Sequence, residues 1–242
     1  LEFDNPNNHD VHSPWEYYPD HYENYNKLRL LLHSEFGVSG PSASTALFLK
    51  KNVSGAPNWN SNYHHAEYWY HSQKRDVEYF GKFETTDEYV PYGQWIQAEG
   101  LRYAIETERR LAPYASGSMV WQVNEPWPNS DNTCLMDYFG NPKMAYYWIK
   151  KAFSDCNVSL RFERNSWKKE FWAEVCIQGD MSVTDEEFKV AIYNSDGKCL
   201  KEYAMNCKNL PCKIEGEFED KNEIYLIRIS HRGIDKEYYF SS

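Results

Sequence analysis

The chain is poor in basic residues: 26 Lys and Arg stand against 36 Asp and Glu, which gives a formal net charge of −10. Nucleic-acid binding depends on clustered basic side chains that neutralise phosphates, so this balance argues against a nucleic-acid partner. Long apolar runs are also missing. The apolar segments, such as residues 28–32 with only Arg29 interrupting them, are far shorter than the roughly 18 residues that indicate a membrane span. We therefore expect no transmembrane helix and no membrane partner.

Several enzyme motifs are absent as well. The sequence has no glycine-rich phosphate loop, no Gly-x-Ser-x-Gly nucleophile elbow and no Cys-x-x-Cys pair of a zinc site. The six cysteines lie in the second half at irregular spacings, which favours free or buried thiols over disulfides and leaves the compartment open. Nothing near Leu1 resembles a signal peptide, and we expect the chain to be a piece of a longer protein. No metal and no cofactor are expected.

Aromatic residues, in contrast, are abundant. The 9 Trp, 20 Tyr and 12 Phe make up 17% of the chain. Such rings fill a core or line a site that stacks on flat or pyranose-like ligands. Seven of the nine Trp and seven of the eight His precede Ser154, so a site rich in these residues is expected in the first part of the chain.

The pattern of that first part predicts two parallel strands joined by a helix. Residues 28–34 begin as an apolar segment broken only by Arg29, which is typical of a strand buried on both faces of a parallel sheet. Residues 94–111 carry apolar side chains at three- and four-residue steps, which predicts an amphipathic helix. A second strand is expected at residues 118–124, and another helix at residues 142–153. The first helix supplies the crossover that parallel strands require.

Residues 42–92 are polar and aromatic with weak periodicity, and we expect loops and short helices there. Four residues within this segment are of types that bind metals: His64, His65, Glu67 and His71. Side chains at helical spacing can share a face and hold an ion. A segment that simply covers the site end of the sheet accounts for them as well, and no metal site is assigned.

After residue 155 the pattern changes to short alternating segments. Strands are expected at residues 158–163, 170–177, 188–193, 200–205, 212–218, 223–230 and 236–240. Seven short strands separated by turn signals suggest an antiparallel β-sandwich of immunoglobulin type. We therefore expect two domains, residues 1–155 and residues 156–242. The first has too few strands to close a barrel or to form a sheet covered on both faces, so it is expected to be incomplete.

Four motifs in the first part occur in a characteristic order. They are His33-Ser-Glu-Phe-Gly37, Gly93-Gln-Trp-Ile-Gln-Ala-Glu-Gly-Leu-Arg102, Trp121-Gln-Val-Asn-Glu-Pro-Trp-Pro128 and Asp137-Tyr-Phe-Gly-Asn-Pro-Lys-Met-Ala-Tyr-Tyr147. Together they resemble glycoside hydrolase family 2, and within it the β-mannosidase branch. The resemblance implies the C-terminal portion of a (β/α)8 barrel, with its seventh and eighth strands at residues 28–34 and 118–124. An immunoglobulin-like domain would follow.

The resemblance also implies roles for individual residues. Glu35 matches the nucleophile of a retaining mechanism. Trp121 matches the tryptophan that forms the floor of the pocket for the terminal sugar, and the loop with His12 and Trp15 resembles a loop that rims this pocket. Three further residues of these motifs complete the candidate substrate-binding set: His33, Asn124 and Glu125.

The chemistry makes Glu35 a reasonable choice. Retaining glycoside hydrolysis needs two carboxyl groups about 5–5.5 Å apart, one to attack the anomeric carbon and one to protonate the leaving oxygen. Glu35 follows a predicted strand, where α/β barrels place catalytic side chains; a structural ion pair is the alternative. Asn124-Glu125 has the form of a barrel acid/base motif, but it follows the nucleophile instead of preceding it. We therefore expect Glu125 to be a rim or structural carboxylate, and the acid/base residue to lie upstream of Leu1.

The expected function follows from these assignments. The chain would be part of a retaining exo-β-glycosidase acting on terminal non-reducing β-linked sugars, with β-mannoside favoured and β-galactoside or β-glucosaminide next. Alone it is expected to be inactive, because the acid/base residue is missing. Its partners would be the carbohydrate substrate and the remainder of its own barrel or another copy. The alternative is a non-catalytic carbohydrate-binding or domain-packing module.

Overall fold

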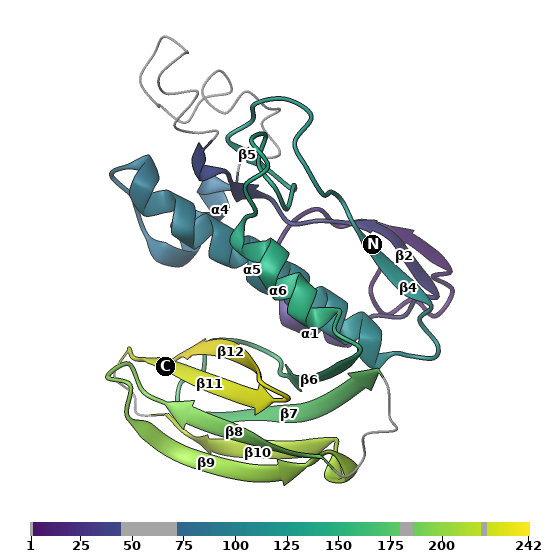
Figure 1. Ribbon diagram of the computed structural model, residues 1–242, viewed down its shortest axis with the longest axis vertical. Helices are drawn as coiled ribbons and strands as arrows, with labels where there is room; N and C mark the ends of the chain where they lie inside the picture. Colours follow the sequence, from purple (N-terminus) through teal and green to yellow (C-terminus); the bar gives the residue numbers. More distant parts are fainter. Residues whose placement is uncertain (1, 45–71, 180–185, 219–221) are drawn as a thin grey trace.

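The computed structural model describes residues 2–44, 72–179, 186–218 and 222–242 (Figure 1). The considered metal ligands His64, His65, Glu67 and His71 lie outside these described residues. Within them, the expected combination of a mixed helix-and-sheet part with antiparallel sheets after it is confirmed. No helix in the described ranges is long and apolar enough to cross a lipid bilayer.

The first part is built on a three-stranded parallel sheet. Its strands are β1 (Asp10–His12), β2 (Leu32–Phe36) and β4 (Gly117–Val120), with β2 in the centre. The sequence pattern missed β1, because a strand of three residues is too short to show alternation. A short helix, α1 (His21–Asn26), joins β1 to β2 and was also missed. β3 (Gly40–Pro41) and β5 (Asp131–Asn132) form a small antiparallel pair.

The strand expected at residues 28–34 is displaced. Lys27 ends α1, and the N–H of Leu28 still donates to the carbonyl of Tyr25 at 3.0 Å, so the chain cannot pair as a strand there. Pairing with β1 begins only at Leu32. The strand expected at residues 118–124 is shorter in the structure, where β4 ends at Val120. The backbone after Trp121 pairs with residues 135 and 136 instead of β2.

Helix α5 (Thr86–Arg110) forms the crossover between β2 and β4, as expected. It begins well before residue 94, where the sequence pattern placed its start. The Thr85 side chain caps the helix by accepting the N–H of Glu88 at 3.2 Å. Pro91 lies in the second turn, where it removes a single backbone hydrogen bond without ending the helix. Two shorter helices, α4 (Gln73–Phe80) and α6 (Met144–Ala152), pack against α5.

The second part consists of two antiparallel sheets, and its seven strands lie within two residues of the expected positions. One sheet has the order β10-β7-β6 and the other β12-β11-β8-β9. The strands are β6 (Cys156–Arg161), β7 (Glu170–Gly179), β8 (Glu187–Tyr193), β9 (Cys199–Asn206), β10 (Cys212–Glu217), β11 (Ile224–His231) and β12 (Ile234–Ser241). Alternate side chains from both sheets belong to one buried core, which includes Phe171 stacked on Phe218 at 4.2 Å. All six cysteines are free thiols, as expected.

Charged residues are buried where α5 meets the second part. Glu106 accepts hydrogen bonds from Arg102 at 3.0 Å, from Lys236 at 2.8 Å and from the Tyr238 hydroxyl at 3.2 Å. Burial lowers the pKa of Lys236 to about 8, although Glu106 opposes this shift. Burial disfavours the charged form of Glu106 as well, but Lys236 and Arg102 outweigh it and lower the pKa of that carboxyl. The two parts of the chain are thus joined by a buried ionic network.

Candidate active site

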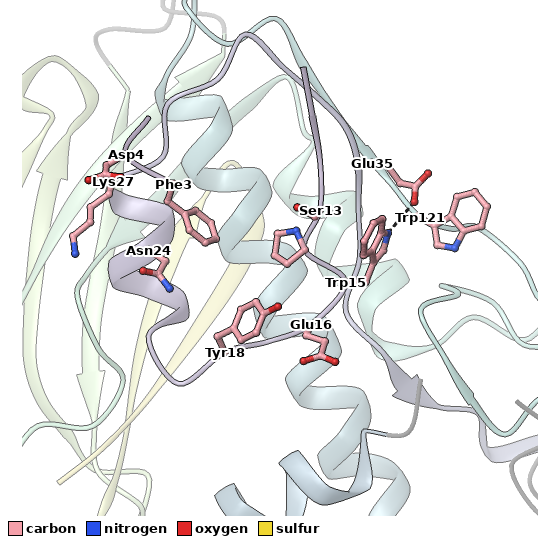
Figure 2. Close-up of a pocket in the computed structure, with 11 residues that line it drawn as sticks. Phe3, Asp4, Ser13, Trp15, Glu16, Tyr18, Asn24, Lys27, Glu35 and Trp121 are labelled. Atoms are coloured by element: carbon pink, nitrogen blue, oxygen red, sulfur yellow. Dashed lines mark hydrogen bonds between the residues drawn. The ribbon is translucent and has the colours of Figure 1, made fainter. Parts of the chain in front are cut away.

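The carboxyl ends of the parallel strands bring four of the candidate residues together. His12 ends β1, Trp15 follows it, Glu35 is the penultimate residue of β2, and Trp121 follows β4. Glu35, Trp15 and Trp121 line an open cavity of about 920 Å³ (Figure 2). The other residues that line it are Phe3, Asp4, Ser13, Pro14, Glu16, Tyr18, Asn24 and Lys27.

Both carboxylate oxygens of Glu35 have a partner. The indole Nε1–H of Trp15 donates to Oε1 at 2.9 Å, and His12 Nε2 lies 3.0 Å from Oε2. The Glu35 side chain keeps 18% of its surface exposed, whereas His12 is 62% exposed. The Trp15 hydrogen bond orients the carboxylate, and the exposed part of the side chain leaves it open to the cavity. Glu35 therefore has the position and the access that a nucleophile needs.

Trp121 is fixed beside Glu35 through the backbone. Its N–H donates to the carbonyl of Phe36 at 2.7 Å, and its side chain is 40% exposed. The peptide bond to Gln122 is cis. A Cβ atom on Gly37 would lie 2.5 Å from the Trp121 carbonyl oxygen, so only glycine allows this approach. Gly37, which belongs to the same motif as Glu35, therefore allows the close approach that positions Trp121 after β4.

His33 occupies a different place from the one expected. It is fully buried, and both ring nitrogens contact protein atoms: Nε2 donates to the Ser13 carbonyl at 2.8 Å, and Nδ1 lies 2.5 Å from Oε1 of Glu108. Burial raises the pKa of Glu108, while His33 opposes the shift. His33 does not line the cavity, and its ring ties β2 to α5 and to the loop that carries Trp15.

Glu125 and Asn124 also lie away from the cavity lining. Glu125 is 4% exposed; it accepts hydrogen bonds from the Ser42 hydroxyl and, at 2.8 Å, from the N–H of Tyr138. Lys143 Nζ is 3.9 Å from its Oε1. The expectation of a structural carboxylate at Glu125 fits this geometry. Asn124 is exposed and forms an isolated bridge with Met136.

Some residues that line the cavity carried no signal in the sequence pattern. Glu16 and Tyr18 follow Trp15 on the same loop, so only their nearness to Trp15 could have indicated them. In Figure 2 the Glu16 side chain points away from the Glu35 carboxylate. Glu16 thus adds a carboxyl group to the lining, in addition to that of Asp4, without facing Glu35.

A buried acidic residue supports the loops behind this site. Asp131 Oδ2 accepts hydrogen bonds from the N–H of Ser72 at 2.8 Å, from the Ser72 hydroxyl at 2.9 Å and from the Tyr89 hydroxyl at 3.2 Å. Burial and the carboxylate of Asp76 raise the pKa of Asp131 to about 7. In the described ranges, no group of three or more His, Cys, Asp or Glu side chains is arranged to hold a metal ion.

Comparison with known sequences identifies fungal relatives. No protein-family model matches the chain. A segment is 30% identical over 82 residues to β-mannosidase B of Aspergillus niger, and the match covers 33% of this chain and 10% of that protein. The likeness to β-mannosidase B of Aspergillus clavatus is 27% over 107 residues, covering 38% of this chain and 12% of that protein. The matches thus span about a tenth of the length of these relatives.

Solved structures share the fold over nearly the whole chain. The β-D-mannosidase from Dictyoglomus thermophilum superposes with a TM-score of 0.66 at 22% identity, covering 96% of this chain and 30% of that one. The exo-chitosanase CsxA of Amycolatopsis orientalis superposes with a TM-score of 0.60 at 16% identity, covering 95% of this chain and 30% of that one. Sequence and fold together confirm that the chain resembles the C-terminal part of the β-mannosidase-like enzymes of glycoside hydrolase family 2.

Proposed function

We propose that the chain is part of a retaining exo-β-glycosidase and supplies its nucleophile, Glu35. The observation that carries this proposal is the placement of Glu35 in an open cavity, at the carboxyl end of the central parallel strand, with Trp15 donating to one carboxylate oxygen and His12 lying 3.0 Å from the other. Catalytic side chains of α/β barrels lie at this end of the strands. Residues 1–155 would then be the C-terminal portion of a (β/α)8 barrel, with β2 and β4 as its seventh and eighth strands. Residues 156–242 would be the immunoglobulin-like domain.

The proposed chemistry is a double displacement. An oxygen of Glu35 attacks the anomeric carbon, a covalent glycosyl-enzyme forms, and the leaving-group oxygen takes a proton from a second carboxyl group. Water, deprotonated by that second carboxylate, then releases the sugar and frees Glu35. The hydrogen bond from Trp15 and the nearby His12 imidazole hold the Glu35 carboxylate in place.

The second carboxyl group would come from polypeptide outside this chain. Glu16 points away from Glu35, Asp4 lies at the opposite end of the cavity in Figure 2, and Glu125 is buried among Ser42, Tyr138 and Lys143. None of the three is in a position to protonate a leaving group at Glu35. General-acid catalysis contributes about 10²–10⁴-fold to rate, so the 242-residue chain alone would be inactive. The remainder of the barrel, or another copy of the chain, would complete the site.

The proposed substrate is a terminal, non-reducing β-linked sugar. Two exposed tryptophans, Trp15 and Trp121, flank Glu35 and offer ring faces to a pyranose, with Trp121 as the floor of the pocket. β-Mannoside is favoured because the relatives are named β-mannosidase. The fold neighbour named exo-chitosanase supports β-glucosaminide as a next candidate. β-Galactoside stands beside it only because of the family resemblance.

The test compares hydrolysis of a panel of nitrophenyl β-glycosides by the full-length polypeptide that carries this sequence, by its Glu35→Gln variant and by the 242-residue chain. We expect activity in the full-length polypeptide, strongest on β-mannoside, and a loss of at least about 10³-fold in Glu35→Gln, the scale seen when a catalytic group is removed. Glu16→Gln is the matched control and should keep most of the activity. Equal activity in Glu35→Gln and the unmodified protein would refute the proposal.

A non-catalytic carbohydrate-binding module is the second candidate. It is favoured by the open cavity, in which exposed Trp15 and Trp121 flank a single carboxylate that faces them. Under this alternative the full-length polypeptide binds β-glycosides without hydrolysing them, and Trp121→Ala abolishes binding while Glu35→Gln does not. The same panel, read by calorimetry as well as by nitrophenol release, therefore separates the two candidates.

A further inference from the structure

A second, aromatic-lined groove lies at the junction between the helices and the second part of the chain. Its volume is about 660 Å³, within the range of about 300–1,000 Å³ that is typical of small-molecule sites. One wall comes from the end of α4 and the first half of α5, and the other from the start of β11 and the end of β12. In Figure 1 this end of β12 lies on the same side of the molecule as α4, away from the parallel sheet of the Glu35 site.

The aromatic rings of this groove contact one another in tilted or edge-to-face pairs, and two of them are exposed. Phe80 meets Tyr92 at a centroid distance of 5.0 Å and an interplanar angle of 50°, and it meets Trp95 at 5.9 Å and 80°. Trp95 in turn meets Tyr239 of the opposite wall at 6.2 Å and 75°. None of these three pairs is stacked in parallel. Phe80 and Tyr92 are also exposed, by 39% and 46%.

The polar groups of the groove point to a neutral or amino-substituted ligand that forms hydrogen bonds. Among the described residues that line it, Glu78 is the only side chain with a full charge. The indole N–H of Trp95 and the side-chain amide of Asn165, which lines the opposite wall, make no hydrogen bond within the described part of the chain. Donors and acceptors are therefore available beside the exposed rings of Phe80 and Tyr92, and one carboxylate would disfavour an anionic ligand.

We propose that this groove is a second carbohydrate-binding site, which holds a short, neutral or amino-substituted β-linked oligosaccharide by stacking on Tyr92 and Trp95. Pyranose rings present an apolar C–H face to aromatic rings and hydroxyl groups at their edges, and the groove offers partners for both. The site is independent of Glu35, and it would anchor a part of the carbohydrate distant from the bond that is cleaved.

The test is heteronuclear NMR titration of the 242-residue chain with β-1,4-mannotetraose and with chitosan tetraose. We expect saturable shifts of the Trp95 indole N–H and the Asn165 side-chain amide, with an apparent Kd in the millimolar range or tighter. Tyr92→Ala should weaken this binding about tenfold, because it removes an exposed stacking face at about 1–2 kcal/mol. Tyr147→Ala removes an equally exposed tyrosine on α6, outside the groove, and should leave the affinity unchanged.

A second pair of variants separates this groove from the Glu35 cavity. Glu35→Gln and Trp121→Ala should leave the shifts of the Trp95 indole intact. If Trp121→Ala abolishes all binding and Tyr92→Ala changes nothing, the oligosaccharide binds only near Glu35 and the proposal is wrong. Absence of shifts at saturating oligosaccharide, or shifts produced by a polyproline peptide but by no saccharide, would also overturn it. The hydrolysis panel decides the role of Glu35 separately.

Discussion

Trp15 donates its indole N–H to Oε1 of Glu35 at 2.9 Å, from the loop after β1 to the end of β2. This hydrogen bond fixes the carboxylate that we propose as nucleophile, and it places an exposed ring against it. The loop that carries Trp15 is itself held by the Ser13 carbonyl, which accepts from buried His33. Two adjacent strands thus determine the position of one carboxyl group.

Replacing Trp15 with phenylalanine should test this hydrogen bond. A hydrogen bond to a charged group contributes about 1.5–3 kcal/mol, so Trp15→Phe in the full-length polypeptide should lower kcat by roughly 10- to 100-fold. Tyr18→Phe removes a polar group from another residue that lines the same cavity and should have little effect. Steady-state kinetics on a nitrophenyl β-mannoside measures both. Equal losses in the two variants would argue against a specific role for Trp15.

Gly37→Ala should disturb Trp121. The added Cβ would meet the Trp121 carbonyl oxygen at 2.5 Å and a Thr133 methyl carbon at 3.1 Å. Overpacking of this kind costs about 1–3 kcal/mol, and we expect that loss in urea unfolding together with a shifted tryptophan emission. Gly117→Ala is the control, since its Cβ would make only an ordinary contact with Leu32 at 3.7 Å. If Gly37→Ala is as stable as Gly117→Ala, the close approach is not a constraint in solution.

Asp131 should make stability depend on pH. Burial and the Asp76 carboxylate raise its pKa from 3.8 to about 7. Between about pH 4 and pH 7 the folded state therefore keeps a proton on Asp131 that the unfolded state has released. The contribution of this proton to the free energy of unfolding is complete below about pH 4 and is lost as the pH rises to about 7. The Asp131→Asn variant has no carboxyl group to ionise at this position, so its free energy of unfolding should fall less between pH 4 and pH 7 than that of the unmodified chain. The difference between the two should be at least about 1.4 kcal/mol, the equivalent of one pKa unit.

Urea unfolding at several pH values between 4 and 7 measures this difference. Asp196→Asn, which removes an exposed carboxyl group in a turn, provides the control and should leave the profile of the unmodified chain unchanged. Parallel profiles for Asp131→Asn and the unmodified chain would mean that Asp131 is ionised in the folded protein throughout the window.

The ion pair between Glu106 and Lys236 should show strong coupling. Each partner is buried, so either Glu106→Gln or Lys236→Met leaves an uncompensated group and should cost about 3–5 kcal/mol. The double variant should lose less than the sum of the two single losses, by about 1–3 kcal/mol. The half-exposed pair Arg228 and Glu237, 2.7 Å apart, is the comparison, with a coupling below about 1 kcal/mol. Additive losses at Glu106 and Lys236 would contradict the buried network.

Local patterns predicted much of this fold. The seven strands after residue 155 were located because apolar and polar residues alternate in them, as in Phe171, Ala173 and Val175 of β7. Glu35 was placed correctly near the carboxyl end of a strand. The start of α5 was missed because Pro91 and Gly93 read as helix breakers, whereas the Thr85 cap and the packing of the helix outweigh them.

The positions of His33 and Glu125 could not be predicted in the same way. Each has partners that are distant in sequence: Glu108 for His33, and Ser42 for Glu125. Sequence spacing contains no information on such contacts, and a polar residue in a site motif can equally support the site from beneath its surface. The aromatic groove was missed for the same reason, since its walls meet only in the folded chain.

The most direct test of the account is covalent trapping of the nucleophile. The full-length polypeptide is treated with dinitrophenyl 2-deoxy-2-fluoro-β-mannoside, whose leaving group needs no general acid, and its peptides are analysed by mass spectrometry. We predict one fluorosugar on the peptide that contains Glu35, and none in the Glu35→Gln variant. A sugar attached to another residue such as Glu16 or Glu125, or labelling that persists in Glu35→Gln, would contradict the assignment of Glu35 as nucleophile.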